Sequence, residues 1–303
     1  GGFLWATIRT FWGWVYLLCL FLWGQIILKK WGGLLAVVVL LLVTTVLGWQ
    51  GVPALQTVQQ VMTSSPVAGM QGLVNSALEN AETVGWTILL VGLGFSMIMI
   101  PAYRLTYRSN VEFQVVNKLQ ERLGTTFAQR YWAKNKGKIV RVLSASFLSV
   151  AVGFGLPIAL WIGLRRVVGS GGPEALPFYF VPNVAEPSWK PVLHYGYFAL
   201  AAILGVFNAA VGEIQKRNKL SGIFAAYQNP VSTMIGSLIL SLFVPAGVLL
   251  YMMGLVMGQM ATISFVLLER QQSKRKKRSR RTSKRRASSS RRRTPQKKPS
   301  QPY

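Results

Sequence analysis

The chain has almost none of the side chains that catalysis and metal binding require. Its 303 residues include eight acidic residues, all of them Glu, and there is no Asp. There is one His, His194, and one Cys, Cys19. A Ser-His-Asp triad would need the single His with a Glu as its third member, and a zinc site with several His or Cys ligands cannot be built from single copies. The inventory argues against a self-contained enzyme, and we expect no catalytic, cofactor-binding or metal-binding residues.

Charged residues are scarce in the first 270 residues and crowded after them. The composition is 51% hydrophobic and 14% charged, yet the formal net charge is +26. The last 33 residues hold 15 of the 34 Lys and Arg and no acidic residue. The rest of the chain is a series of apolar blocks joined by polar segments. This layout is typical of membrane spans joined by loops.

Apolar segments that approach the length of a membrane span recur along the chain. A helix needs about 20 residues to cross about 30 Å of hydrocarbon. Five segments come near this length, at residues 3–27, 33–49, 84–102, 143–163 and 192–212. A sixth block, Thr233 to Leu268, is too long for one span and is interrupted at Pro245, so it predicts two helices folded as a hairpin. The expected fold is an all-α polytopic membrane protein with five spans and a C-terminal helical hairpin, seven spans in all.

The distribution of Lys and Arg between the apolar blocks predicts an orientation. Residues 103–142 contain nine Lys and Arg and residues 213–228 contain three, so both segments should face the cytosol. Residues 51–83 contain none and should face the opposite side. Seven spans then place the basic C-terminal segment in the cytosol. Arg165 and Arg166, at the outer end of the fourth span, depart from this rule.

The same pattern divides the chain into four parts. Residues 1–50 form a first two-helix membrane unit, and residues 51–83 form a non-cytosolic loop whose apolar spacing predicts one or two interfacial amphipathic helices. Residues 84–270 form a helix bundle with the cytosolic basic segment 103–142. The amphipathic part of that segment should either press onto an anionic membrane surface or cover the inner mouth of the bundle. Residues 271–303 are rich in Arg, Lys and Ser, cannot bury a core, and should form a disordered tail.

The basic tail must meet an anionic partner, and three interpretations are open. One partner is the cytosolic leaflet, where each basic residue near the surface adds about 1 kcal/mol. Another is RNA, whose binding releases counterions and weakens as salt rises. In the third interpretation the charges bind neither partner and only fix the orientation of the chain in the membrane. The residues expected to bind nucleic acid or lipid are Lys274, Arg275, Lys276, Lys277, Arg278, Arg280, Arg281, Lys284, Arg285, Arg286, Arg291, Arg292 and Arg293.

Two further patterns predict residues that are modified and residues at which helices pack. Thr282, Ser283 and Ser288 closely follow paired arginines, a pattern that basophilic kinases accept. A phosphate there would add about −2 charge and would release the tail from an anionic surface. Gly254 and Gly258 have the small-x-x-x-small spacing that allows helices to approach closely. We expect such packing to support a homo- or hetero-oligomer in the membrane.

These features favour a non-enzymatic, multi-pass membrane protein that anchors or organises a membrane-associated assembly and remodels its membrane. Viral replication and envelope membrane proteins have this outline, and the Gly-Gly start without Met fits a polyprotein product. A viral chain of this kind would reside in the host endoplasmic reticulum membrane. The alternative is a subunit of a membrane transport or secretion channel, which predicts polar faces within the spans. Few ionisable residues lie there, so the sequence favours the first interpretation.

Overall fold

The fold is known from a computed structural model, which describes residues 2–28, 32–49, 53–78, 81–169, 176–186, 195–218, 220 and 230–291. The chain divides into two units, Gly1–Thr262 and Ile263–Tyr303, and the boundary falls inside the last helix. Within the described ranges the regular structure is helical, apart from one isolated bridge between Phe178 and Val181. The predicted all-α class is confirmed for these ranges.

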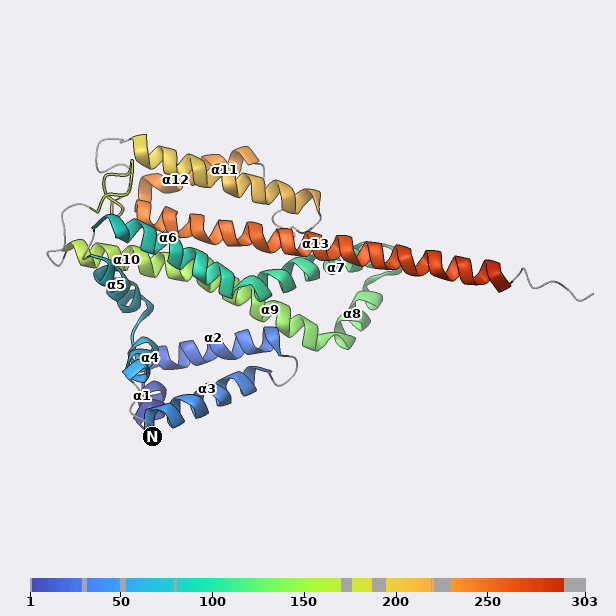
Figure 1. The fold of residues 1–303 in the computed structure, drawn as a ribbon, viewed down its shortest axis with the longest axis horizontal. Coiled ribbons are helices and arrows are strands. Elements are labelled where there is room, and N and C mark those ends of the chain that lie inside the picture. The colour runs from blue at the N-terminus through green and yellow to red at the C-terminus, as the bar shows by residue number, and fades with distance from the viewer. Residues whose placement is uncertain are drawn as a thin grey trace, which may run out of the picture. The chain divides into compact units, whose positions relative to one another are not determined.

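The helices follow one another with short breaks, except for the longer connections between α10 and α11 and between α11 and α12 (Figure 1). Their bounds are α1 (Gly2–Arg9), α2 (Phe11–Ile27), α3 (Gly32–Trp49), α4 (Pro53–Thr63), α5 (Pro66–Ala77), α6 (Ala81–Ile98), α7 (Ile100–Leu123), α8 (Thr125–Lys134), α9 (Lys136–Val150), the π-helix η1 (Ala151–Gly155), α10 (Leu156–Gly169), α11 (Tyr195–Arg217), α12 (Pro230–Phe243) and α13 (Ala246–Arg291). The segments α9, η1 and α10 are continuous and form one helix of 34 residues.

Several of these helices are long and apolar enough to cross a membrane. Three satisfy this alone: Lys136–Gly169, Tyr195–Arg217 and Ala246–Ser273. A fourth candidate is the pair Thr83–Ile98 and Ile100–Leu123, which is bent by 55°. Shorter apolar helices lie at Phe11–Ile27, Gly33–Val46 and Val231–Leu240. The described residues therefore indicate a membrane protein and contain three candidate spans, or four if the bent pair is one span; the seven spans that the sequence predicts are not confirmed.

One of the shorter helices, α3, has the surface of a lipid-facing element. Its exposed apolar side chains, each at least 41% exposed, are Leu34, Leu35, Val38, Val39, Leu42, Val43 and Val46. Soluble proteins rarely leave a continuous apolar patch of this kind uncovered. The hydroxyls of Thr44 and Thr45 donate to carbonyls of the same helix, those of Leu40 (2.7 Å) and Leu41 (2.6 Å). The helix thus presents little unsatisfied polarity to a hydrocarbon environment.

The last apolar block breaks where the sequence predicts. Val244–Pro245 separates α12 from α13, and the chain doubles back there (Figure 1). The first N–H groups of a helix have no acceptor within the helix. In α13 the N–H of Ala246 donates to the carbonyl of Glu186 (3.2 Å), and the N–H of Gly247 donates to the carbonyl of Val184 (2.7 Å). These bonds join the start of α13 to the loop before α11.

That loop, residues 176–186, folds around the buried side chain of Asn183. The Asn183 Oδ1 accepts hydrogen bonds from the backbone N–H of Leu176 (3.3 Å) and of Ala185 (3.0 Å). Its backbone carbonyl accepts a hydrogen bond from the Tyr197 hydroxyl of α11 (2.8 Å). One residue therefore holds both ends of the loop and joins the loop to a candidate spanning helix, α11.

Replacing Asn183 with Ala should destabilise the protein because two buried N–H donors would lose their acceptor. A buried donor without an acceptor costs about 1–3 kcal/mol. We therefore expect a loss of about 2 kcal/mol or more, measured as thermal unfolding of the purified protein in mild detergent. Asn75→Ala is the matched control, since Asn75 is exposed on α5. Equal losses in the two variants would contradict the role of Asn183.

The segment with predicted interfacial helices, residues 51–83, contains α4 and α5. The second begins at a capping serine, because the Ser65 Oγ accepts a hydrogen bond from the N–H of Ala68 (3.1 Å). Helix α5 packs closely against α10, where a Cβ at Gly163 would lie 3.2 Å from the backbone N of Gln71. The helical prediction is confirmed for this segment, whereas its place at a membrane interface stays a prediction.

Residues 271–291 correct the expectation of a disordered tail. Helix α13 does not end with its apolar segment but continues through these residues to Arg291. The sequence from Gln271 to Arg291 contains no Gly or Pro. Lys, Arg and Gln are good helix formers, and adding residues to an existing helix avoids the cost of nucleation. The prediction of disorder is wrong for residues 271–291, and residues 292–303 lie outside the described residues.

Candidate anionic-surface interface

The basic segment between α6 and α10 forms a folded surface at one end of its unit. We call residues 111–138, from the second half of α7 through α8 to the first turn of α9, the basic cap. The turn between α7 and α8 is made by Gly124, whose φ of 84° lies in the left-handed region that favours glycine. This turn lets α8 leave the direction of α7 and meet α9.

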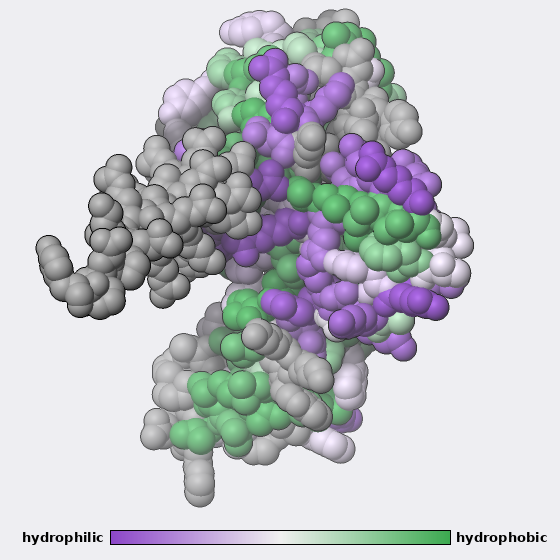
Figure 2. All heavy atoms as spheres, turned by 90° about the vertical axis from the view of Figure 1, so that its right-hand side faces the viewer, coloured by the Kyte–Doolittle hydropathy of each residue, from purple (hydrophilic) through white to green (hydrophobic). Residues whose placement is uncertain are grey.

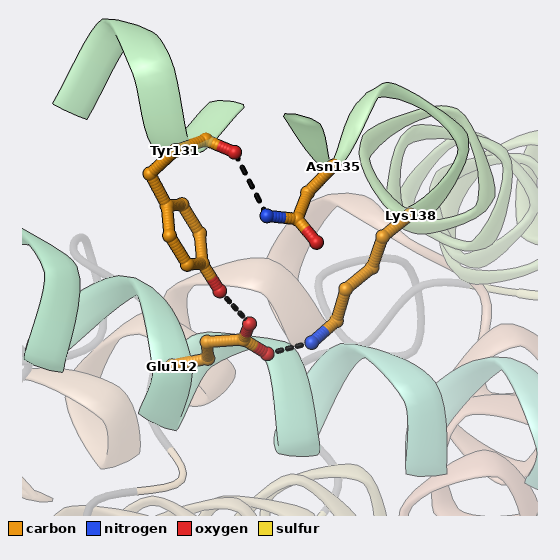
Figure 3. Close-up of polar contacts among 4 residues, drawn as sticks. All are labelled: Glu112, Tyr131, Asn135 and Lys138. Atoms are coloured by element: carbon orange, nitrogen blue, oxygen red, sulfur yellow. Dashed lines mark hydrogen bonds and ion pairs between the residues drawn. The ribbon is translucent and has the colours of Figure 1, made fainter. Parts of the chain in front are cut away.

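Glu112 joins three elements of the basic cap (Figure 3). Its carboxylate accepts a hydrogen bond from the Tyr131 hydroxyl of α8 and pairs with the Lys138 ammonium of α9. Between α8 and α9, Asn135 donates from Nδ2 to the carbonyl of Tyr131 (2.8 Å). Because the partners of Glu112 come from different helices, one carboxylate fixes the placement of α7, α8 and α9 relative to one another.

Apolar contacts support the same arrangement. The rings of Phe113 on α7 and Trp132 on α8 lie 4.9 Å apart, and Trp132 meets Tyr131 edge to face at 4.9 Å. Val116 and Ala128 are buried. The sequence left open whether this amphipathic segment packs on the protein or on a membrane. These buried residues show that part of its apolar face packs within the protein.

The outer face of the basic cap combines exposed cations with exposed apolar side chains. Val115 is 52% exposed and Leu123 is 58% exposed. The exposed basic residues of the cap are Lys118, Arg122, Arg130, Lys134 and Lys136. Figure 2 views the protein from this side and shows hydrophilic side chains around smaller hydrophobic areas. Helices that lie on anionic membrane surfaces have this combination of apolar and basic groups.

Arg141, just beyond the cap, has a different role from the exposed cations. Its Nε donates to the carbonyl of Gln25 (3.0 Å) and its Nη2 donates to the carbonyl of Ile26 (2.6 Å). These carbonyls belong to the last turn of α2, where helix carbonyls lack partners and a positive charge is favourable. The charge of Arg141 therefore stabilises a contact between α9 and α2.

Replacing Glu112 with Gln should loosen the basic cap because the Lys138 ammonium would lose its carboxylate. The pair is partly exposed, so we expect a stability loss of about 1 kcal/mol. Amide hydrogen exchange over residues 125–138 should also become faster. Glu121→Gln is the matched control, since Glu121 is exposed on the same helix. Faster exchange in the control as well would assign the effect to net charge and not to the contacts of Glu112 with Tyr131 and Lys138.

The predicted tail residues lie along a single helix as far as the structure describes them. Lys274 to Arg291 occupy the C-terminal part of α13, together with the predicted phosphorylation sites Thr282, Ser283 and Ser288. Arg292 and Arg293 lie outside the described residues. The tail follows the apolar part of α13 without an intervening break.

Gly254 and Gly258 pack against α6 of the same chain. A Cβ at Gly254 would lie 2.6 Å from the backbone N of Leu93, and a Cβ at Gly258 would lie 2.5 Å from the Cβ of Ser96. The Ser96 hydroxyl donates across this contact to the carbonyl of Leu255 (3.1 Å). Because the contacts advance in the same order along both helices, α6 and α13 run parallel here. The glycine spacing serves a contact inside the chain.

Sequence reasoning missed the residues that organise the basic cap. The available signal was composition, since Glu112 is one of two carboxylates among nine basic residues in segment 103–142. Its partners Tyr131 and Lys138 are too distant in sequence to be chosen from spacing alone.

Comparison of the chain with family models, curated proteins and solved structures finds no match.

Proposed function

We propose that this chain is a non-enzymatic, multi-pass membrane protein that anchors or organises a membrane-associated assembly by holding anionic lipid at one face of its bilayer. The observation that carries this proposal is the continuity of α13. The apolar stretch Ala246–Ser273 passes into the basic stretch without leaving the helix. The first basic residues then lie at the level of the lipid headgroups, where anionic lipids attract them. This placement favours lipid over RNA as the ligand.

The parallel packing of α6 and α13 supports a common side for the two basic regions. Helix α6 leads into α7 and the basic cap, and α13 leads into the tail. Two helices that cross a bilayer in the same direction deliver the segments after them to the same side. The positive-inside rule makes that side the cytosol.

We also propose that the shorter apolar helices cross the membrane, which gives seven spans. Helices α2, α3 and α12 have 17, 18 and 14 residues. At about 1.5 Å per residue they are at most about 27 Å long, somewhat less than a hydrocarbon core of about 30 Å. Helices that are too short thin the bilayer around them. This supports a role in shaping the membrane that holds the protein.

The proposal is tested with the full chain in phosphatidylcholine nanodiscs. The loaded nanodiscs are titrated, in rising salt, with phosphatidylcholine vesicles, with vesicles that also contain phosphatidylserine, and with single-stranded RNA. We expect salt-sensitive binding to the phosphatidylserine vesicles and weaker binding to RNA. Preference for RNA would make the chain a membrane-to-RNA tether and overturn the choice of lipid. Binding to neither ligand would leave the charges as topology signals and overturn the proposal.

A channel or secretion subunit is the second candidate function, and polar contacts within the bundle favour it. Gln215 of α11 donates from Nε2 to the Tyr107 hydroxyl of α7 (3.0 Å). This contact follows the 55° bend between α6 and α7. Interrupted helices with polar neighbours line the solute paths of many transporters. Ionic conductance of the reconstituted chain across a planar bilayer would favour this candidate over the first.

A further inference from the structure

Arg165 and Arg166, which depart from the positive-inside pattern, end an exposed stripe that runs along η1 and α10. Phe154, Ile158 and Ile162 recur every four residues and are 67%, 53% and 39% exposed. Arg165 and Arg166 follow Ile162 by three and four residues and are also exposed, so they lie on the same helix face. The stripe is therefore apolar over two turns and cationic in the next.

Neither arginine has a carboxylate partner among the described residues. The guanidinium of Arg165 instead lies over the ring of Trp161, 5.1 Å from its centroid. Both arginines occupy the end of a 34-residue helix that is long and apolar enough to span a membrane. Their charges are therefore available to an anion at the level of the headgroups.

An apolar cavity of about 430 Å³ lies beside this stripe. It is bounded by residues of α2, α5, α6, α9, η1 and α10, and no charged side chain lines it among the residues described. Its walls include Val15, Cys19, Val67, Gly155 and Ile162. Gly155 leaves room because a Cβ there would meet nothing within 4 Å.

We propose that this cavity holds an acyl chain of an anionic phospholipid whose phosphate is bound by Arg165 and Arg166. The apolar walls and the exposed stripe at the side of a spanning helix suit a hydrocarbon chain that enters from the bilayer. The paired guanidinium groups suit the phosphate, because the planar arginine fork binds phosphate oxygens bidentately. A net negative headgroup is preferred, since two adjacent cations repel the choline of a zwitterionic lipid.

This site is independent of the proposed function at the basic cap. Lys136, within the cap, and Gly169 begin and end one helix of 34 residues. At 1.5 Å per residue these ends are separated by about 50 Å. The arginines therefore mark the membrane face opposite to the cap, and failure of one proposal leaves the other standing.

Photolabelling of the full chain in nanodiscs tests the site. The probe is phosphatidylglycerol with a diazirine near the end of one acyl chain, and the matched probe is phosphatidylcholine with the same chain. We expect label on residues 15–19 and 155–162, with phosphatidylglycerol labelling about tenfold above phosphatidylcholine. Arg165→Gln with Arg166→Gln should remove this preference. Lys216→Gln with Arg217→Gln, an exposed basic pair at the end of α11, should keep it.

A second pair of variants tests the cavity itself. Gly155→Phe should fill the cavity and lower labelling by the phosphatidylglycerol probe about tenfold. Gly153→Phe is the matched control, because a Cβ at Gly153 also meets nothing within 4 Å and Gly153 does not line the cavity. Equal labelling by both probes, or label on α3 equal to that at the cavity, would overturn the proposal and indicate general lipid contact only.

Discussion

Replacing Gly254 with Leu should cause the largest loss of stability of any single substitution considered for this chain. A Cβ there would lie 2.6 Å from the backbone N of Leu93 and 3.0 Å from the carbonyl carbon of Gly92. Backbone atoms cannot rotate away, so α6 and α13 would have to separate along their shared contact. Overpacking costs about 1–3 kcal/mol and occasionally more, and we expect a loss of at least about 3 kcal/mol here.

The measurement is thermal unfolding in mild detergent, with the monodisperse fraction as a second readout. Gly236→Leu is the matched control, because Gly236 also lies in an apolar helix and a Cβ there meets nothing within 4 Å. The control should change stability little, since removing a glycine from a helix is mildly favourable. Similar unfolding temperatures for the two variants would disprove a close approach at Gly254.

Gly258 is expected to respond differently from Gly254. The atoms nearest to a Cβ at Gly258 belong to the side chain of Ser96. Gly258→Ala should therefore destabilise the protein, and Ser96→Gly in the same chain should restore part of the loss. A double-mutant cycle measures this coupling, which we expect to be about 1 kcal/mol. Absence of coupling would show that Gly258 and Ser96 are not in contact and would contradict this prediction.

Neutralising four tail arginines should cause the largest loss of function. Arg275, Arg278, Arg280 and Arg281 are changed together to Gln, which keeps a helix-forming side chain. At about 1 kcal/mol for each basic residue near an anionic surface, the loss is about 4 kcal/mol, or about a thousandfold in affinity. The measurement is binding of the full chain in nanodiscs to vesicles that contain phosphatidylserine.

The control for the tail removes the same charge elsewhere. Arg9, Lys190, Lys216 and Arg217 are changed to Gln, so both variants fall from a net charge of +26 to +22. None of these residues belongs to the tail, to the basic cap or to the site proposed at Arg165 and Arg166, so their loss should leave vesicle binding unchanged. An equal drop in both variants would attribute binding to the net charge of the protein instead of to the tail.

Local signals in the sequence were sufficient for much of the fold. Apolar runs predicted the helices because a chain in hydrocarbon must satisfy its backbone internally. Pro245 predicted the break between α12 and α13 because proline has no N–H to donate. These features depend on neighbours in sequence, and a single chain is enough to find them.

Other features depended on geometry that hydropathy does not encode. The tail was expected to be disordered because it cannot bury a core, yet a helix of lysine and arginine needs only local hydrogen bonds to continue from α13. Glu112 could not be paired with Tyr131 and Lys138 before the turn at Gly124 was known. The cavity beside α10 arises from helices distant in sequence, and the sequence identified Arg165 and Arg166 only as an exception to the positive-inside rule.

The π-helix η1 sets the angular phase between the two halves of the 34-residue helix. The N–H of Leu156 donates to the carbonyl of Ala151, five residues earlier, so this turn holds one residue more than an α-helical turn. One residue corresponds to about 100° of rotation about the helix axis. Deleting a residue here would shorten the helix only slightly, but it would rotate the buried side chains Leu160 and Leu164 off the core. The register of this one turn thus decides which side of α10 packs against the protein and which side stays exposed.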